Sequence, residues 1–125
     1  MILDTNALSA FADGDKKLLP VIESEVSLAL PVIALGEFLY GIHQSRLRER
    51  YEQWLRANLP LFDLLLIGAE TARRYAGICG ELKAAGLPIP SNDVWIAALA
   101  REHGSPLVSR DQHFRAVNGL RLLTW

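Results

Sequence analysis

The 125-residue chain is predicted to be a single α/β domain built around a mostly parallel sheet. Short apolar runs alternate with longer helical patterns along the whole chain, which is typical of sheets joined by crossover helices. The run over residues 26–30 is short and apolar, as expected for a parallel strand in the core. Because there is no internal repeat, low-complexity tract or linker, residues 1–125 are taken as one domain.

Five apolar runs bounded by turn-forming or helix-capping residues are the predicted strands. Asp4-Thr5-Asn6 breaks the first run, which is very short because this acid stands so near the start of the chain. Asp63 interrupts the third run and is expected at its exposed end. The predicted strands cover residues 1–3, 26–30, 62–67, 107–108 and 120–125.

Helical periodicity predicts most of the segments between these strands. Asn6 is the expected cap of a brief first helix, and Pro20 is expected to kink or restart the second. Pro31 fits the first turn of the third helix. A fourth helix, over residues 46–59, carries apolar residues at spacings of four, seven and eight. The predicted helices up to this point cover residues 7–11, 15–25, 32–44 and 46–59.

The later helices end at residues suited to stopping a helix. Gly86 is expected to stop the helix over residues 69–85, and Gly104 the helix that follows. Asp111 opens a last short helix, which runs through Phe114. On the helix over residues 69–85, the stripe expected to face the core consists of Ala72, Tyr75, Ala76, Cys79 and Leu82.

The helix that starts near Ser91 carries the first unusual acid. Ser91 is its predicted N-cap, because a serine hydroxyl can accept from a free N–H of the first turn. Residues 94–100 are apolar on every face, and such a helix is normally buried. Asp93 is therefore carried to the edge of the core, where an ionised carboxylate is costly unless it is paired or metal-bound. The alternative is a helix-start acid that complements the dipole, worth roughly 0.3–1 kcal/mol.

Three more acids stand in similarly unusual positions. Asp4 and Asp111 directly follow apolar strands, where α/β sheets bind ligands at the carboxyl ends of their strands. The alternative for both acids is that they only stabilise turns, as aspartate commonly does. Glu37 is the only charged residue between Pro31 and Ile42, so it projects from an apolar surface. We interpret Glu37 as a functional carboxylate, with a structural hydrogen bond as the alternative.

These acids together predict a metal site. Right-handed parallel crossovers bring the strand ends to one edge of the sheet, where crowded carboxylates repel one another. An oxygen-only set without Cys or His ligand spacing suits Mg²⁺ or Mn²⁺ rather than zinc. His43 and His103 are expected in solvent near helix ends. His113, beside Phe114, is interpreted as structural rather than as a general base.

Composition restricts the class of protein. The single cysteine allows no intramolecular disulfide, which fits a reducing compartment. With no signal peptide and no membrane-spanning window expected, the predicted location is the cytoplasm. The net charge of −1 does not by itself indicate a nucleic-acid partner. If four of the 14 acidic residues bind metal, the other ten face 13 basic ones, and such a surface permits a polyanion.

In these motifs the chain resembles the PIN domain family, and most closely the small VapC-type toxins of bacterial toxin–antitoxin pairs. The resemblance extends over the whole chain. No single motif is specific to this family, but the four motifs together, in the correct order, are. The matching segments are Leu3-Asp4-Thr5-Asn6, Gly36-Glu37, Asn92-Asp93 with Ile96-Ala97-Ala98, and Leu107-Val108-Ser109-Arg110-Asp111 with His113-Phe114; the tail from Gly119-Leu120 to Trp125 also fits.

The resemblance implies a three-layer α/β/α fold and a Mg²⁺- or Mn²⁺-dependent endoribonuclease. A metal-activated water would cleave RNA and leave a 5′-phosphate. The implied catalytic and metal-binding acids are Asp4, Glu37, Asp93 and Asp111. The polar residues that would orient these acids or hold water are Thr5, Asn6, Asn92 and Ser109.

The resemblance also implies a small antitoxin whose tail lies across the site, and a homodimer. The aromatic and basic region from Phe38 to Arg56 is the expected antitoxin contact. The alternative is that Phe38, Tyr40, Tyr51 and Trp54 are core or dimer contacts.

Two other classes of protein stay open as alternatives. One is a PIN-like module that binds RNA or protein without cutting. The other is a phosphatase or receiver domain on a similar sheet. Such a phosphatase would need a second acid where Asn6 stands, and a receiver would need a late lysine, whereas none follows Lys83.

Overall fold

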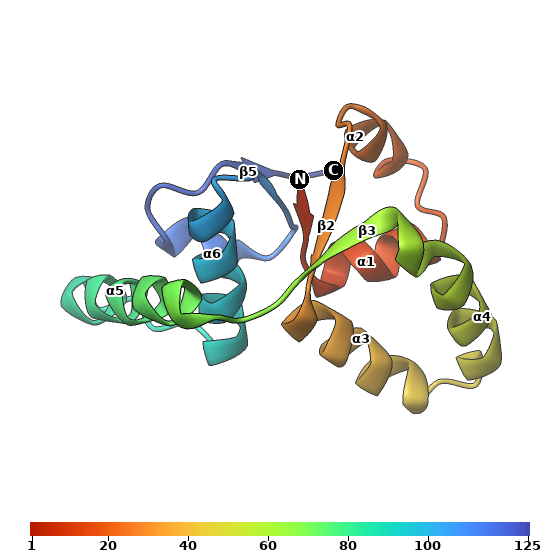
Figure 1. The fold of residues 1–125 in the computed structure, drawn as a ribbon, viewed down its shortest axis with the longest axis horizontal. Helices are drawn as coiled ribbons and strands as arrows, with labels where there is room; N and C mark the ends of the chain where they lie inside the picture. Colours follow the sequence, from red (N-terminus) through yellow and green to blue (C-terminus); the bar gives the residue numbers. More distant parts are fainter.

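The computed structural model describes residues 1–125 and contains one five-stranded sheet in which every pairing is parallel. The strand order is β3-β2-β1-β4-β5, so the first strand lies in the middle (Figure 1). The predicted α/β fold with a parallel sheet is therefore confirmed. The strands are β1 (Ile2–Leu3), β2 (Leu28–Pro31), β3 (Phe62–Leu65), β4 (Leu107–Val108) and β5 (Leu122–Leu123).

Backbone hydrogen bonds on both sides hold the very short β1 in place. The N–H of Ile2 donates to the carbonyl of Pro106 at 2.8 Å. On the other side, the N–H of Ala29 donates to the carbonyl of Met1 at 2.8 Å. The amino group of Met1 donates to the carbonyl of Ser27 at 2.9 Å. Two residues thus suffice for a central strand. Because this strand is fixed on both sides, the position of Asp4 directly after it is fixed as well.

The helices form two groups around the sheet (Figure 1). The first, third and fourth helices pack against one another, and the fifth packs against the sixth. The helices are α1 (Thr5–Ala12), α2 (Leu19–Glu23), α3 (Val32–His43), α4 (Arg48–Asn58), α5 (Ala69–Ala85) and α6 (Ser91–His103), with short 3-10 helices η1 (Leu59–Leu61) and η2 (Gln112–Ala116).

Two predicted helix caps are wrong. Asp4 caps α1, because its carboxylate accepts from the backbone N–H of Ala7 at 2.8 Å, whereas Asn6 lies inside the helix. Ser91 is the first residue of α6, and Pro90 stands at the cap position without a side-chain bond. Gly86 and Gly104 do end their helices, with positive φ of 67° and 60°, as predicted.

Several predicted elements are shorter in the structure. The helix predicted over residues 15–25 begins only at Leu19, with Pro20 in its first turn. The second strand starts at Leu28, and Val26 is fully exposed. The other shortened elements, predicted over residues 46–59, 62–67 and 120–125, are α4, β3 and β5.

The buried face of α5 differs from the predicted stripe. Ala72 and Ala76 are exposed, whereas Thr71, Ile78 and Leu82 are buried. Alanine is small enough to be either buried or exposed. The alanines of α5 therefore do not show from the sequence which face of the helix is buried. The buried Thr71 is satisfied because its hydroxyl donates to Glu102 at 2.6 Å.

An aromatic cluster joins α1, α3 and α4. Phe38 is buried, and its ring centre lies 6.2 Å from the ring centres of both Tyr51 and Trp54. Phe11 packs edge-on against Trp54 at 5.4 Å. Phe38 is thus a core residue, Tyr51 and Trp54 are half-buried around it, and Tyr40 is 69% exposed.

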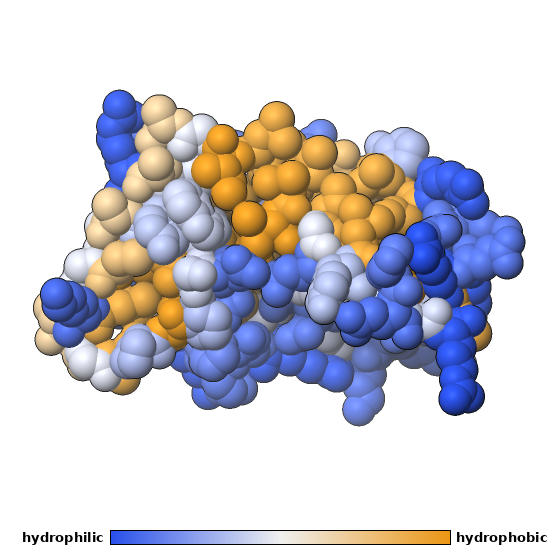
Figure 2. All heavy atoms as spheres, turned by 90° about the horizontal axis from the view of Figure 1, so that it is seen from below, coloured by the Kyte–Doolittle hydropathy of each residue, from blue (hydrophilic) through white to orange (hydrophobic).

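Apolar surface gathers on one face of the molecule (Figure 2). Separately, no helix combines the length and apolarity needed to cross a bilayer. The large apolar side chains exposed on α3, on β3 and just after β3 are Leu39, Tyr40, Leu64, Leu66 and Ile67.

Candidate active site

The four acids singled out in the sequence lie together at the carboxyl edge of the sheet. Asp4 follows β1, Asp111 follows β4, Glu37 stands on α3 and Asp93 lies in the first turn of α6. They line a single hollow of about 130 Å³, which we call the acidic hollow. Its lining residues are Asp4, Thr5, Asn6, Glu37, Asp93, Ile96 and Asp111.

Asp4 is the most buried of these acids, with 3% of its surface exposed. One carboxylate oxygen accepts from the N–H of Ala7 and the other accepts from the hydroxyl of Ser109. Burial nevertheless raises the pKa of Asp4 to about 6, because the loss of solvation outweighs these two bonds, and the nearby Asp111 and Asp93 raise it further. The site therefore resists a negative charge that no cation balances.

Ser109 connects two of the acids. Its hydroxyl donates to Asp4, and its oxygen accepts from the backbone N–H of Asp111 at 2.9 Å. Ser109 and Asp4 are 105 residues apart in sequence, so this bond joins the start of the chain to its last quarter.

Glu37 receives a hydrogen bond on its otherwise apolar helix. The hydroxyl of Thr5 donates to Glu37 Oε1 at 2.8 Å. Glu37 also lines two neighbouring hollows, of about 580 and 280 Å³, that border the acidic hollow through Thr5. The hydrogen-bond alternative for Glu37 is thus present, and the side chain still reaches the space shared by the acids.

His113 faces two of the acids. Its Nδ1 lies 2.9 Å from Asp93 Oδ2 and 3.1 Å from Asp111 Oδ1. Burial raises the pKa of Asp93, against the hydrogen bond from His113, and Asp111 and Glu37 raise it further. We had interpreted His113 as structural beside Phe114. Only Phe114 is buried, and the His113 ring turns toward the acids.

The four supporting polar residues differ in what they contact. Thr5 and Ser109 hydrogen-bond to acids of the hollow. Asn6 is exposed and lines the hollow without a side-chain hydrogen bond. Asn92 is exposed and lines the larger neighbouring hollow, with Tyr40.

Arg110, between Ser109 and Asp111, anchors the loop after β4. Its guanidinium stacks 4.3 Å from the ring centre of Trp125, and its Nε donates to the backbone oxygen of Trp125 at 3.0 Å. The Trp125 indole N–H donates to Asp15 Oδ2 at 3.1 Å. We did not predict this cluster, because it joins three segments that are distant in sequence.

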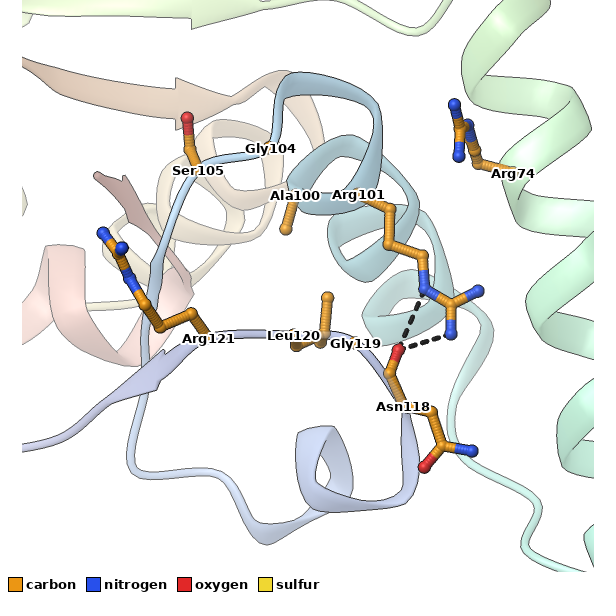
Figure 3. Close-up of a pocket in the computed structure, with 9 residues that line it drawn as sticks. All are labelled: Arg74, Ala100, Arg101, Gly104, Ser105, Asn118, Gly119, Leu120 and Arg121. Atoms are coloured by element: carbon orange, nitrogen blue, oxygen red, sulfur yellow. Dashed lines mark hydrogen bonds between the residues drawn. The ribbon is translucent and has the colours of Figure 1, made fainter.

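A second, basic hollow of about 470 Å³ lies at the amino ends of β4 and β5, the edge opposite the acids (Figure 3). Arg101 there is held by Glu81 at 2.8 Å and by the carbonyl of Asn118. Arg74 is paired with Glu70 at 2.9 Å. Two of the three arginines that line the hollow are therefore already compensated by acids of the protein, whereas Arg121 makes no ion pair.

Comparison with known proteins places this geometry in context. The PIN domain family model matches residues 1–120. A Haemophilus influenzae protein named Ribonuclease VapC2 is 33% identical over 94 residues, covering 74% of this chain and 71% of that protein. Ribonuclease VapC2 of Rickettsia felis is 27% identical over 129 residues, covering 99% of this chain and 96% of its own.

Solved structures show the same fold. A chain of the VapBC2 complex from Rickettsia felis, bound to a DNA fragment from its promoter, aligns with a TM-score of 0.89, at 25% identity and with 99% and 97% of the two chains covered. A chain of FitAcB from Neisseria gonorrhoeae aligns with a TM-score of 0.84, at 24% identity and with 98% and 95% covered.

Proposed function

The chain belongs to the PIN domain family, and from that premise we propose that it is a metal-dependent endoribonuclease acting as the toxin of a toxin–antitoxin pair. Relatives from two genera, with 27% and 33% identity, are named as ribonucleases. The observation that carries the proposal within this chain is the acidic hollow, lined by Asp4, Glu37, Asp93 and Asp111.

The residues of the hollow fit a divalent cation. Carboxylate oxygens are the ligands that Mg²⁺ and Mn²⁺ accept most readily in proteins. The raised pKa values of Asp4 and Asp93 fit as well, because a bound cation would favour the ionised form of each. We propose that these two acids, with Glu37 and Asp111, hold Mg²⁺ or Mn²⁺.

The chain's own groups have distinct roles in the proposed hydrolysis. When bound, the cation would offset charge on the scissile phosphate and make a nearby water more acidic. Glu37, oriented by the hydroxyl of Thr5, would either help to hold the cation or accept a proton from that water. Ser109 fixes the orientation of Asp4 and the backbone of Asp111. Attack by water leaves a 5′-phosphate and a 3′-hydroxyl, and a 2′,3′-cyclic phosphate product would contradict this role of water.

Cleavage of a mixed cellular RNA pool by the purified, partner-free protein tests the proposal. We expect discrete cuts with Mg²⁺ or Mn²⁺ and none with EDTA. Asp93→Asn keeps the side-chain size but removes a charge, and it should lose the cuts. Asp63→Asn is the matched control, because Asp63 is exposed on β3.

If Asp93→Asn cuts as well as wild type, the activity does not belong to this site. No cutting by the folded, metal-replete protein on two RNA sources would favour a binding module.

Ser109→Ala is expected to reduce cleavage by about 10- to 100-fold, the range found when groups that orient metal ligands are removed. The same change removes a bond that lowers the pKa of Asp4, so this pKa should rise in the metal-free protein. Carbon-13 NMR titration of the Asp4 carboxyl measures the shift. Ser105→Ala, at the opposite edge of the sheet, should alter neither quantity.

We further propose two protein partners and a location. Structural neighbours come from toxin–antitoxin complexes, and by analogy this chain binds a small antitoxin. The homodimer stays a prediction; the exposed apolar side chains of α3 and β3 supply surface of the kind that interfaces bury. Equilibrium sedimentation of the isolated chain tests it. Cellular RNA is met in the cytoplasm, whose reducing conditions suit the single free cysteine.

A further inference from the structure

We propose that His113 is a direct ligand of the divalent cation through Nδ1, alongside Asp93 and Asp111, and that it biases the site toward Mn²⁺ over Mg²⁺. This inference rests on the proposed function, because it takes the acidic hollow to be the cation site. It adds a nitrogen donor to a set that the sequence led us to expect as oxygen only.

The distances around His113 suit a shared cation. Its Nδ1 lies 2.9 Å from Asp93 Oδ2 and 3.1 Å from Asp111 Oδ1. Adjacent ligands of an octahedral ion with bonds of 2.0–2.2 Å are about 3 Å apart, so both separations match neighbouring coordination positions. Ligand atoms of these three residues all lie within 4.8 Å of one another.

Three potential ligand atoms converge beside His113. Carboxylate oxygens of two different residues approach Nδ1 at nearly equal distance. In the metal-free protein Nδ1 hydrogen-bonds to Asp93, while Asp111 Oδ1 accepts from the backbone N–H of His113 at 2.9 Å. A cation that binds all three groups would satisfy both carboxylates and the nitrogen together.

The backbone fixes the ring before any ligand arrives. Asp111 caps η2 and accepts from the backbone N–H of His113 at 2.9 Å. The next residue, Phe114, is 1% exposed and anchors the turn in the core. The imidazole is thus held beside Asp93 and Asp111 by the short helix that Asp111 caps, while 49% of its side chain stays exposed.

A nitrogen donor changes the preference among metals. Mg²⁺ binds oxygen ligands almost exclusively, whereas imidazole is a good ligand for transition-metal ions. We therefore expect His113→Gln to weaken Mn²⁺ binding by about tenfold or more, with a smaller change for Mg²⁺. Isothermal titration calorimetry of both metals on the full chain measures the two changes.

Electron spin-echo envelope modulation of bound Mn²⁺ tests the ligand directly, because a coordinated imidazole gives a nitrogen-14 signal. We expect this signal in the wild type and in His103→Gln, and its loss in His113→Gln. His103 is the matched control because it lies at the other end of α6. Circular dichroism checks that each variant is folded.

The outcomes separate this inference from the proposed function. Mn²⁺ that binds in an Asp93-dependent way without a nitrogen signal would overturn the role of His113 and leave the nuclease proposal standing. A nitrogen signal that persists in His113→Gln would do the same. Failure of the wild type both to bind Mn²⁺ and to cleave RNA would overturn both proposals.

Discussion

Asp4→Asn is expected to reduce RNA cleavage by more than about 100-fold, since loss of a ligand should cost at least as much as loss of a group that orients one. The same change should stabilise the metal-free protein. Asparagine can still cap α1 by accepting from Ala7, and it carries no charge into the buried site. Activity and stability are thus expected to move in opposite directions.

The pH dependence follows from the raised pKa of Asp4. The folded value is about 6 against an ordinary value of 3.8, so the folded protein binds this proton more tightly than the unfolded chain. The free energy of unfolding of the metal-free wild type should therefore fall as pH rises from about 4 to about 6, and then level off. A shift of about two units corresponds to about 3 kcal/mol.

Urea unfolding in EDTA measures this effect. The advantage of Asp4→Asn over wild type should be small near pH 4 and should reach about 3 kcal/mol at pH 7. Asp63→Asn, on the exposed side of β3, should follow the wild-type curve. An Asp4→Asn variant whose stability falls with pH as steeply as that of wild type would show that another group is responsible.

Phe114→Ala is expected to lower the free energy of unfolding by about 3–5 kcal/mol, the usual cost of emptying a buried aromatic site. Phe114 is 1% exposed and fixes η2, which carries His113 and follows Asp111. Urea denaturation measures the loss. Phe114→Leu, which keeps most of the volume, should cost less than about 1.5 kcal/mol. An alanine variant no less stable than the leucine variant would show that Phe114 is not an anchor.

The fold class was predictable because apolar runs and helical periods are local properties of the sequence. The ends of the elements depend on partners that local patterns do not contain. Val26 belongs to the same apolar run as Leu28, but the pairing with β1 begins at Ala29, opposite Ile2. The face of α5 was misjudged at Ala72 and Ala76 because packing against α6 decides it.

The clustering of the acids was predictable because Asp4 and Asp111 follow parallel strands, whereas Glu37 and Asp93 are charges on apolar helices. Asn92 was predicted to support the acids, but adjacent residues of a helix point about 100° apart, and Asn92 lines the larger neighbouring hollow with Glu37 rather than the acidic hollow with Asp93. The contacts of His113 with Asp93 and Asp111 were not predicted, because they depend on the short helix that Asp111 caps. The Arg110–Trp125 contact left no local signal either.

The central position of β1 has a consequence for the timing of synthesis. Asp4 is made 105 residues before its partner Ser109. At about 5–20 residues per second, a ribosome needs roughly 5–20 s to pass from one to the other. During that interval β1 has no β4 beside it, and the hollow lacks Asp93 and Asp111 for most of the time. We therefore expect the growing chain to lack the complete acidic hollow until Ser109 and Asp111 have been made.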